Sequence, residues 1–149
     1  MLDLDDLDRV ILTILQDDAR TSFADLARRL RVSEGTIHLR VRKLQEKGAI
    51  EGFHAKLSPG KLGKGLTAIV SVKADPSLYA DVLRRIVEME DVYEVFDMTG
   101  EFYAVLKVRA ADIESLAKII DKIGGIEGVV STQTDVVLKT LKDQQKIPF

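Results

Sequence analysis

Apolar residues in the first 50 positions recur at the spacing of one helical face in three short stretches. The second stretch begins at Ser22, which forms a capping-box pattern with Asp25, and the third begins at Ser33, a favoured N-cap residue. Gly48 ends the third stretch. A turn of about three residues joins the last two stretches, which predicts a helix-turn-helix motif. The three apolar faces comprise Leu4, Leu7, Val10, Ile11, Ile14 and Leu15; Phe23, Leu26, Ala27 and Leu30; and Ile37, Val41 and Leu44.

The pattern changes after this motif. Residues 50–57 alternate enough to predict a strand, either as a short wing or as part of a linker. Residues 58–65 (Ser-Pro-Gly-Lys-Leu-Gly-Lys-Gly) concentrate glycine and proline, which favour turns and loops. We therefore expect a helix-turn-helix domain over 1–57, a linker over 58–65 and a second domain over 66–149.

Strand-like and helix-like patterns follow one another in the second domain. We expect strands over 66–73, 92–98, 102–108 and 129–138. One helix opens at Asp75-Pro76 and carries Leu78, Val82, Leu83 and Ile86. A second helix carries Ile113, Leu116, Ala117, Ile120 and Ile123, and ends at Gly124-Gly125. The order βαββαβ predicts a ferredoxin-like domain with both helices on one face of the sheet, so the chain belongs to the α+β class.

The opposite face of this sheet also carries apolar residues. Phe102, Ala104, Leu106 and Val108 alternate with Tyr103, Val105 and Lys107, and Ile69 lies among Thr67, Ser71 and Lys73. A sheet with apolar residues on both faces needs a second cover, and we expect a partner subunit to supply it. The alternative is that these are isolated surface apolar residues, which are common on any protein.

Composition excludes several classes of protein and site. The 149-residue chain has no cysteine and two histidines, so disulfides, thiolate zinc sites and a cysteine nucleophile are excluded, and a histidine-rich metal site is not expected. No recognisable spacing pairs a nucleophile with a base, and we expect neither catalysis nor a cofactor. No apolar run approaches the ~20 residues that cross a bilayer. The start of the chain is acidic where a secretory signal would be basic, so we expect a cytoplasmic protein.

Basic residues are concentrated in the helix-turn-helix motif. The whole chain has 22 basic and 24 acidic side chains, but residues 26–47 contain seven basic and two acidic ones, a local charge of +5. Such a patch on a neutral domain is typical of a protein that binds duplex DNA. The alternative is an ordinary solvated helix face. On the third helix the candidate DNA contacts are Thr36, His38, Leu39, Arg42 and Lys43, with Arg40 on the flank and Ser33 at the phosphate-binding N-terminus.

Several stretches resemble one known family, the leucine-responsive regulator (Lrp/AsnC, feast/famine) family of prokaryotic transcription factors. They are residues 4–12, 15–20, 26–41, 48–50, 57–59, 99–102 and 129–140, so the resemblance covers nearly the whole chain. It implies a DNA-binding regulator of transcription whose second domain dimerises through its sheet. It also implies assembly into dimers, octamers or larger discs that sense amino acids where dimers meet.

The resemblance also implies an effector site. The turn Thr99-Gly100-Glu101-Phe102 matches the family's effector-contacting loop, with Thr132 and Thr134 as neighbours and Glu101 at the acidic position. Tyr103 occupies the position where the family usually has an aspartate that holds an α-ammonium group, and tyrosine cannot supply that charge. A changed ligand, or an effector-independent architectural DNA-binding protein, is therefore the alternative. In a second departure, Arg31 occupies a position usually held by glycine, where it must avoid a left-handed conformation or accept a cost of ~1 kcal/mol.

An RNA-recognition module is a further alternative for a ferredoxin-like domain. Such a module needs stacking aromatic residues and basic residues on the open sheet face. Phe102 and Tyr103 are expected on opposite faces, and residues 58–149 carry 12 basic against 14 acidic side chains. These features favour DNA binding through the first domain.

Overall fold

The computed structural model describes residues 2–144 and 146–148. The chain forms two compact units. The first consists of the residues up to Lys56 together with those from Lys142 onward, and the second spans Leu57–Leu141. The sequence predicts a second domain over 66–149. In the structure, the described residues from Lys142 onward belong to the first unit, and Ile147 hydrogen-bonds to Gln16 of the first helix.

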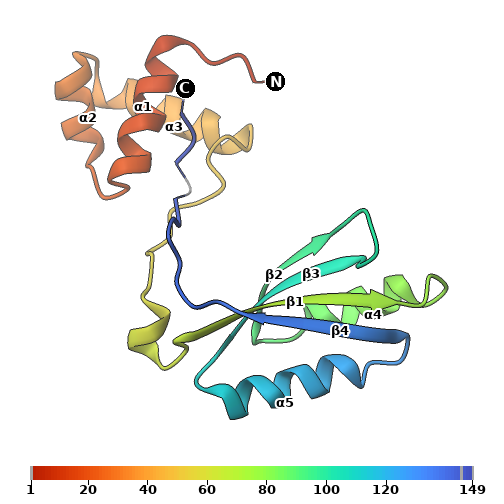
Figure 1. The fold of residues 1–149 in the computed structure, drawn as a ribbon. Helices are drawn as coiled ribbons and strands as arrows, with labels where there is room; N and C mark the ends of the chain where they lie inside the picture. The colour runs from red at the N-terminus through yellow and green to blue at the C-terminus, as the bar shows by residue number, and fades with distance from the viewer. Residues whose placement is uncertain (1, 145, 149) are drawn as a thin grey trace. The chain divides into compact units, whose positions relative to one another are not determined.

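The first unit contains three helices, α1 (Asp6–Asp17), α2 (Phe23–Leu30) and α3 (Glu34–Glu46) (Figure 1). Each has a side-chain cap, because Asp5, Ser22 and Ser33 each accept the backbone N–H of the residue three positions later. The helix-turn-helix prediction is thus confirmed. The buried core consists of Ile11, Leu12, Leu15, Leu26, Ala27, Ile37, Val41 and Leu44. The sequence pattern places Val10 on the apolar face, but its side chain is 42% exposed and Leu12 is buried instead.

The connection between the units is irregular. The strand predicted over 50–57 is wrong, because the segment forms neither helix nor strand. Its residues from Glu51 onward are exposed, so no apolar side is buried to fix a register. A 3₁₀ turn, Pro59–Leu62, follows within the predicted linker and ends at Gly63, whose φ of 77° suits glycine.

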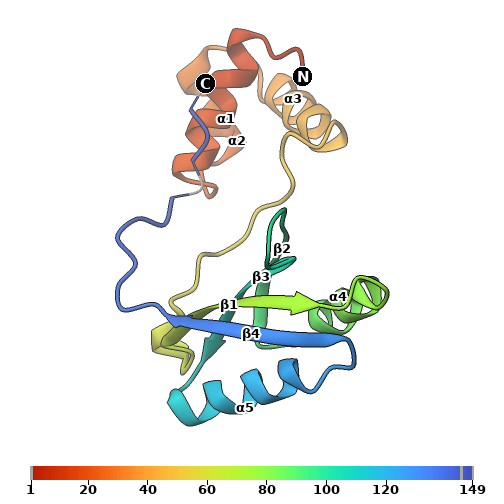
Figure 2. The ribbon, with the colours of Figure 1, turned by 45° about the vertical axis from the view of Figure 1, so that its right-hand side comes forward.

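The second unit has the predicted βαββαβ order. Its elements are β1 (Leu66–Ala74), α4 (Tyr79–Val87), β2 (Val92–Asp97), β3 (Ala104–Ala110), α5 (Ile113–Gly124) and β4 (Val129–Val136). The sheet order is β2-β3-β1-β4 and every neighbouring pair is antiparallel (Figures 1 and 2). Alternate residues of β1 and β3 form a buried core with side chains from both helices, so α4 and α5 cover the same face.

The bounds of several elements in this unit differ from the predicted ones by one to three residues. Helix α4 begins at Tyr79, because the Asp75 carboxylate accepts the N–H and hydroxyl of Ser77 and forms a local turn instead of a helix cap. Strand β3 begins at Ala104, so Phe102 belongs to the hairpin connection. Strand β4 ends at Val136, and Leu138 is 98% exposed.

The sheet face opposite the helices carries the apolar residues that we expected there. Ile69 and Val105 lie on this open face and are only partly exposed. Phe96 pairs with Val105 across β2 and β3 and is 50% exposed. The guanidinium of Arg109 lies 4.9 Å from the ring centre of Tyr93. A face of this composition in a unit of this size is suited to association with another chain.

Candidate DNA-binding and effector sites

Helix α3 has one buried side and one solvent-facing side. Ile37, Val41 and Leu44 pack in the core of the first unit. The other side exposes His38, Leu39, Arg42 and Lys43, with Leu39 54% exposed. Thr36 is half-buried. Its hydroxyl lies 2.8 Å from the Ser33 hydroxyl in the N-terminal cap of the helix. Six of the seven residues predicted to contact DNA thus form the outward side, the first turn and the N-cap of one helix.

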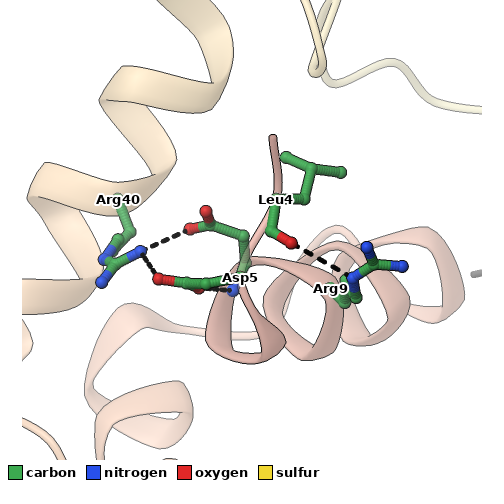
Figure 3. A network of polar contacts seen from close by, with 5 residues as sticks. Leu4, Asp5, Arg9 and Arg40 are labelled. Atoms are coloured by element: carbon green, nitrogen blue, oxygen red, sulfur yellow. Dashed lines mark hydrogen bonds and ion pairs between the residues drawn. The ribbon is translucent and has the colours of Figure 1, made fainter. Parts of the chain in front are cut away.

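Arg40 has a different environment. Its guanidinium pairs with the Asp5 carboxylate and donates to Asp8 Oδ1 at 3.1 Å (Figure 3). The backbone N–H of Asp8 and the Arg40 guanidinium both lower the pKa of Asp5, and the two carboxylates raise the pKa of Arg40. Asp8 is only 14% exposed. The sequence pattern predicts Arg40 as a DNA contact on the flank of the helix, but two carboxylates at the start of α1 neutralise its charge, so this geometry favours a structural role.

Local acidic partners also reduce the charge of the basic patch. Arg28 pairs with Asp25, and Arg42 Nε donates to Glu46 Oε1 at 2.8 Å. Both pairs are strongly exposed, and such pairs exchange readily with water or with a phosphate. Within the described residues no ion pair involves Arg29, Arg31, Lys43 or Lys47. The patch therefore retains basic side chains that are available to an anionic partner.

An open groove of about 500 Å³ lies beside the exposed side of α3. The His38 ring meets Phe23 edge to face at a centroid distance of 4.5 Å, and Phe53 forms another part of the groove. Its remaining lining comes from Leu39, Val41, Arg42 and Gln45. Sequence reasoning missed Phe53 and Gln45. Phe53 lies in a segment without helix or strand and with no helical period, and Gln45 was not among the residues that the charge pattern selected.

Arg31 adopts the left-handed conformation that its position in the turn requires. Its φ is 56° and its ψ 42°, and it is the only non-glycine residue with positive φ among those described. The backbone N–H groups of Arg31 and Val32 both donate to the Ala27 carbonyl, which closes the end of α2. Of the two options left open by the sequence, the chain therefore accepts the strained one. The side chain remains exposed beside the motif.

The hairpin between β2 and β3 holds most of the candidate effector residues. Gly100 has a φ of 126°, and Thr99 and Glu101 flank it in an exposed turn. The Met98 N–H donates to the Tyr103 carbonyl at 2.7 Å and closes the hairpin. Glu101 Oε1 lies 3.2 Å from Lys73 Nζ. The carboxylate that the resemblance assigns to an ammonium ligand is therefore paired with a lysine of the same chain.

Tyr79 fixes the base of this hairpin and was not predicted. Its hydroxyl lies 2.7 Å from Asp97 Oδ1 and 2.9 Å from the Tyr103 carbonyl oxygen. The Tyr79 and Tyr103 rings lie 5.4 Å apart. Burial, followed by the hydrogen bond to Asp97, raises the pKa of Tyr79 to about 12. The Tyr103 ring is thus packed against α4, and no sequence signal connected these two tyrosines.

Thr132 and Thr134 lie on β4, opposite Val72 and Val70 of β1. Because facing residues of an antiparallel pair share one side of the sheet, both threonines lie on the helix-covered side. Strand β1 separates β4 from β3, so within one chain they are two strands from the hairpin. The fold therefore does not bring the two threonines together with the hairpin in one protomer.

Other kinds of site are not found in the part of the chain that the structure describes. Residues 2–144 and 146–148 contain no group of three or more side chains suited to bind a metal ion. In the same residues no helix is long and apolar enough to cross a membrane.

Comparison with known proteins places both units in one family. Residues 4–45 match the AsnC-type helix-turn-helix domain, and residues 67–147 match the Lrp/AsnC ligand binding domain. The chain is 40% identical over 147 residues to the HTH-type transcriptional regulator Ptr1 of Methanocaldococcus jannaschii, covering 98% of this chain and 99% of that protein.

Two solved structures give the same result. E. coli AsnC matches with a TM-score of 0.92 at 32% identity, covering 97% of this chain and 99% of that one. A feast or famine regulatory protein from M. tuberculosis, complexed with L-methionine, matches with a TM-score of 0.90 at 30% identity, covering 97% and 99%. The chain belongs to the Lrp/AsnC family of helix-turn-helix transcriptional regulators.

Proposed function

We propose that this regulator binds double-stranded DNA in the cytoplasm through α3, which enters the major groove. The observation that carries the proposal is the division of α3 into a buried apolar side and an exposed side with His38, Leu39, Arg42 and Lys43. Arginine and histidine can reach base edges, and a leucine can contact a thymine methyl group. The groove beside Phe53 widens the surface that a base edge or sugar can contact.

Within this proposal the basic residues have different roles. Arg42 and Lys43 are exposed and contact bases or phosphates. Arg31, in the turn between α2 and α3, contacts the sugar-phosphate backbone of the DNA. Ser33 uses its hydroxyl for the cap, so the free N–H groups of the first turn of α3 supply the phosphate contact there. Arg40 holds α3 against α1 instead of contacting DNA.

We also propose that the protein acts as a homodimer or a higher oligomer, such as an octamer. The apolar open face of the sheet, with Ile69, Phe96 and Val105, supports association through the second unit. Two DNA-binding units, one from each protomer and related by a two-fold axis, require a near-palindromic DNA site. Its half-sites are then spaced by one helical turn or a multiple of it.

An amino acid or a related small molecule modulates binding in this proposal. The M. tuberculosis regulator of the same fold was solved with L-methionine, which supports an amino acid as the ligand class. The N–H of Gly100 and the hydroxyls of Thr132 and Thr134 are candidates to hold a carboxylate. Because these threonines lie two strands away in one chain, the pocket requires hairpins and strands from different protomers. Glu101 must leave Lys73 to face an ammonium group.

The DNA-binding part is tested by titrating the protein against the promoter of its own gene and against random duplex at several salt concentrations. A specific regulator binds its operator 10³-fold or more tightly than random DNA, and the preference persists at each salt concentration. Equal affinity for both duplexes would reject sequence-specific binding.

The second candidate function is an architectural DNA-binding protein without an effector. The observation in its favour is Tyr103, which supplies no carboxylate and packs against Tyr79. Calorimetry with each amino acid, followed by sedimentation, separates the two functions. A ligand that modulates the regulator must bind one assembly state better than another and so change the sedimenting species. If no amino acid binds, the architectural function is supported.

A further inference from the structure

The end of α1 is in contact with the last part of the chain. The Gln16 side chain hydrogen-bonds to the backbone of Ile147, a residue 131 positions later in the chain. Its Nε2 donates to the Ile147 carbonyl at 3.1 Å, and its Oε1 accepts the Ile147 N–H at 2.7 Å. One side-chain amide thus satisfies both polar groups of one residue, as a neighbouring strand does.

The contact is made to the backbone and not to the side chain of Ile147, which is 65% exposed. This type of recognition selects an extended segment and is nearly independent of the residue type at that position. Asp17, next to Gln16, adds a charge contact because it pairs with Lys146. Two consecutive residues at the end of α1, Gln16 and Asp17, therefore bind two consecutive residues of the segment, Ile147 and Lys146.

A second anchor lies at the other end of the segment. Lys56 Nζ lies 2.9 Å from Asp143 Oδ2 and donates to the Asp143 carbonyl at 3.2 Å. Lys56 is also the last residue of the N-terminal part of the first unit. The segment is thus fastened to the first unit at Asp143 and again at Lys146 and Ile147.

We propose that the face of α1 formed by Gln16 and Asp17 is a docking surface for the described part of the chain's own C-terminal segment, residues 142–144 and 146–148. The segment is then a component of the DNA-reading unit, and the chain passes between the two units twice, after Lys56 and before Lys142. Two connections restrict the orientations of the first unit more than one does. DNA-binding units whose orientations are restricted in this way lose less conformational freedom when they bind an operator with two half-sites.

Docking itself is independent of DNA and is tested by limited trypsin digestion of the full-length protein. The measured quantity is the rate of cleavage after Lys146, which the docked state hinders because Lys146 is paired with Asp17. Gln16→Ala removes both hydrogen bonds and should raise this rate about tenfold. Gln16→Glu keeps the acceptor, loses the donor and should give an intermediate rate. Alanine is a good helix former, so α1 persists in the first variant.

Thr13→Ala is the matched control on the same helix, since the Thr13 hydroxyl donates to the Arg9 carbonyl of α1 and, among the described residues, has no hydrogen bond to the C-terminal segment. It should leave the cleavage rate unchanged. If Gln16→Ala cleaves at the rate of the unsubstituted protein, the docking surface is rejected.

The consequence for DNA binding rests on the proposed function and has its own readout. Gln16→Ala should weaken binding to a two-half-site operator severalfold while leaving the affinity for a single half-site unchanged. If cleavage accelerates and both affinities stay the same, the restriction of the DNA-binding units is rejected. If the unsubstituted protein binds no DNA, the proposed function fails while the cleavage result still decides the docking.

Discussion

Arg40 of α3 is paired with Asp5, the residue that caps α1, although the two are 35 positions apart in the chain (Figure 3). The Asp5 carboxylate performs two tasks, since its Oδ1 accepts the Asp8 N–H at 2.9 Å and its Oδ2 pairs with the guanidinium. The recognition helix is therefore tied to the first turn of α1 by charge as well as by its apolar side. This pair separates the two arginines of α3 into a structural one and an exposed one.

Substitution of these two arginines should affect two different properties, DNA affinity for Arg42 and stability for Arg40. Arg42→Ala should lower operator affinity about tenfold and leave the unfolding midpoint almost unchanged, because its pair with Glu46 is exposed. Arg40→Ala should lower the unfolding midpoint by about 5 °C. Thermal unfolding and DNA titration of both variants measure this.

The salt dependence of binding provides the control. If Arg42 contacts a phosphate, its removal reduces the slope of log affinity against log salt by about 0.9, whereas Arg40→Ala leaves the slope unchanged. A reduced slope for Arg40→Ala would show that Arg40 reaches the DNA after all.

Acid should weaken the first unit through Asp5 and Asp25. The pKa of Asp25 is lowered by the Ser22 hydroxyl, and that of Asp5 by the Asp8 N–H and by Arg40. A carboxyl whose pKa is lower in the folded state stabilises it fully above the unfolded value of about 3.9, and this contribution is lost as the pH falls through the folded pKa. The unfolding midpoint should thus vary little from about pH 7 to 5 on account of these groups and fall below about pH 4.

Asp5→Asn isolates the charge in this effect, because asparagine caps a helix as well as aspartate does. The variant should show a lower midpoint at neutral pH and a smaller fall in acid. An identical pH profile would mean that the pair with Arg40 adds nothing to stability.

Arg31→Gly should stabilise the first unit and weaken DNA binding. Glycine adopts the left-handed conformation without the cost of ~1 kcal/mol that arginine bears. The same change removes a basic side chain from the turn. Chemical denaturation and DNA titration measure the two effects. Arg29→Ala, a substitution inside α2, serves as a charge-matched control without the conformational gain.

Tyr79→Phe should loosen the hairpin of the candidate effector site. The change removes the hydrogen bonds to Asp97 and to the Tyr103 carbonyl, at a cost of about 1 kcal/mol. Amide exchange of residues 98–103 should become faster, whereas exchange in α3 should not change. If the hairpin amides of the variant exchange at the same rate as those of the unsubstituted protein, the packing of the residue 79 ring against Tyr103 is sufficient to order the hairpin.

Alkaline pH provides an independent measurement of the same hydroxyl. Its pKa is raised to about 12 in the folded protein, so its contribution is fully present below the unfolded value of about 10 and is lost as the pH rises through 12. The difference between the unfolding midpoints of the unsubstituted protein and Tyr79→Phe should therefore shrink across this range. A difference that stays constant would contradict the assignment.

The sequence by itself determined the helices of the first unit and the order of elements in the second. Caps such as Ser22 and Ser33 act within one turn, and the periods 3.6 and 2 report which side of an element is buried, so both signals are local. The outward side of α3 followed from the same periodicity. The roles of residues that depend on partners far along the chain were predicted less well.

Only the tertiary structure decided what those positions do. Arg40 has the same helical position with or without a carboxylate beside it, and the carboxylate comes from α1. Tyr79 contacts Tyr103, which lies 24 positions later, and Ile147 contacts Gln16 across 131 positions. The segment over 50–57 has a strand-like pattern without a strand, because a strand requires a partner that periodicity does not specify. Ion pairs, hydrogen bonds and strand pairing between distant residues are properties of the folded arrangement, and the local pattern of the chain does not contain them.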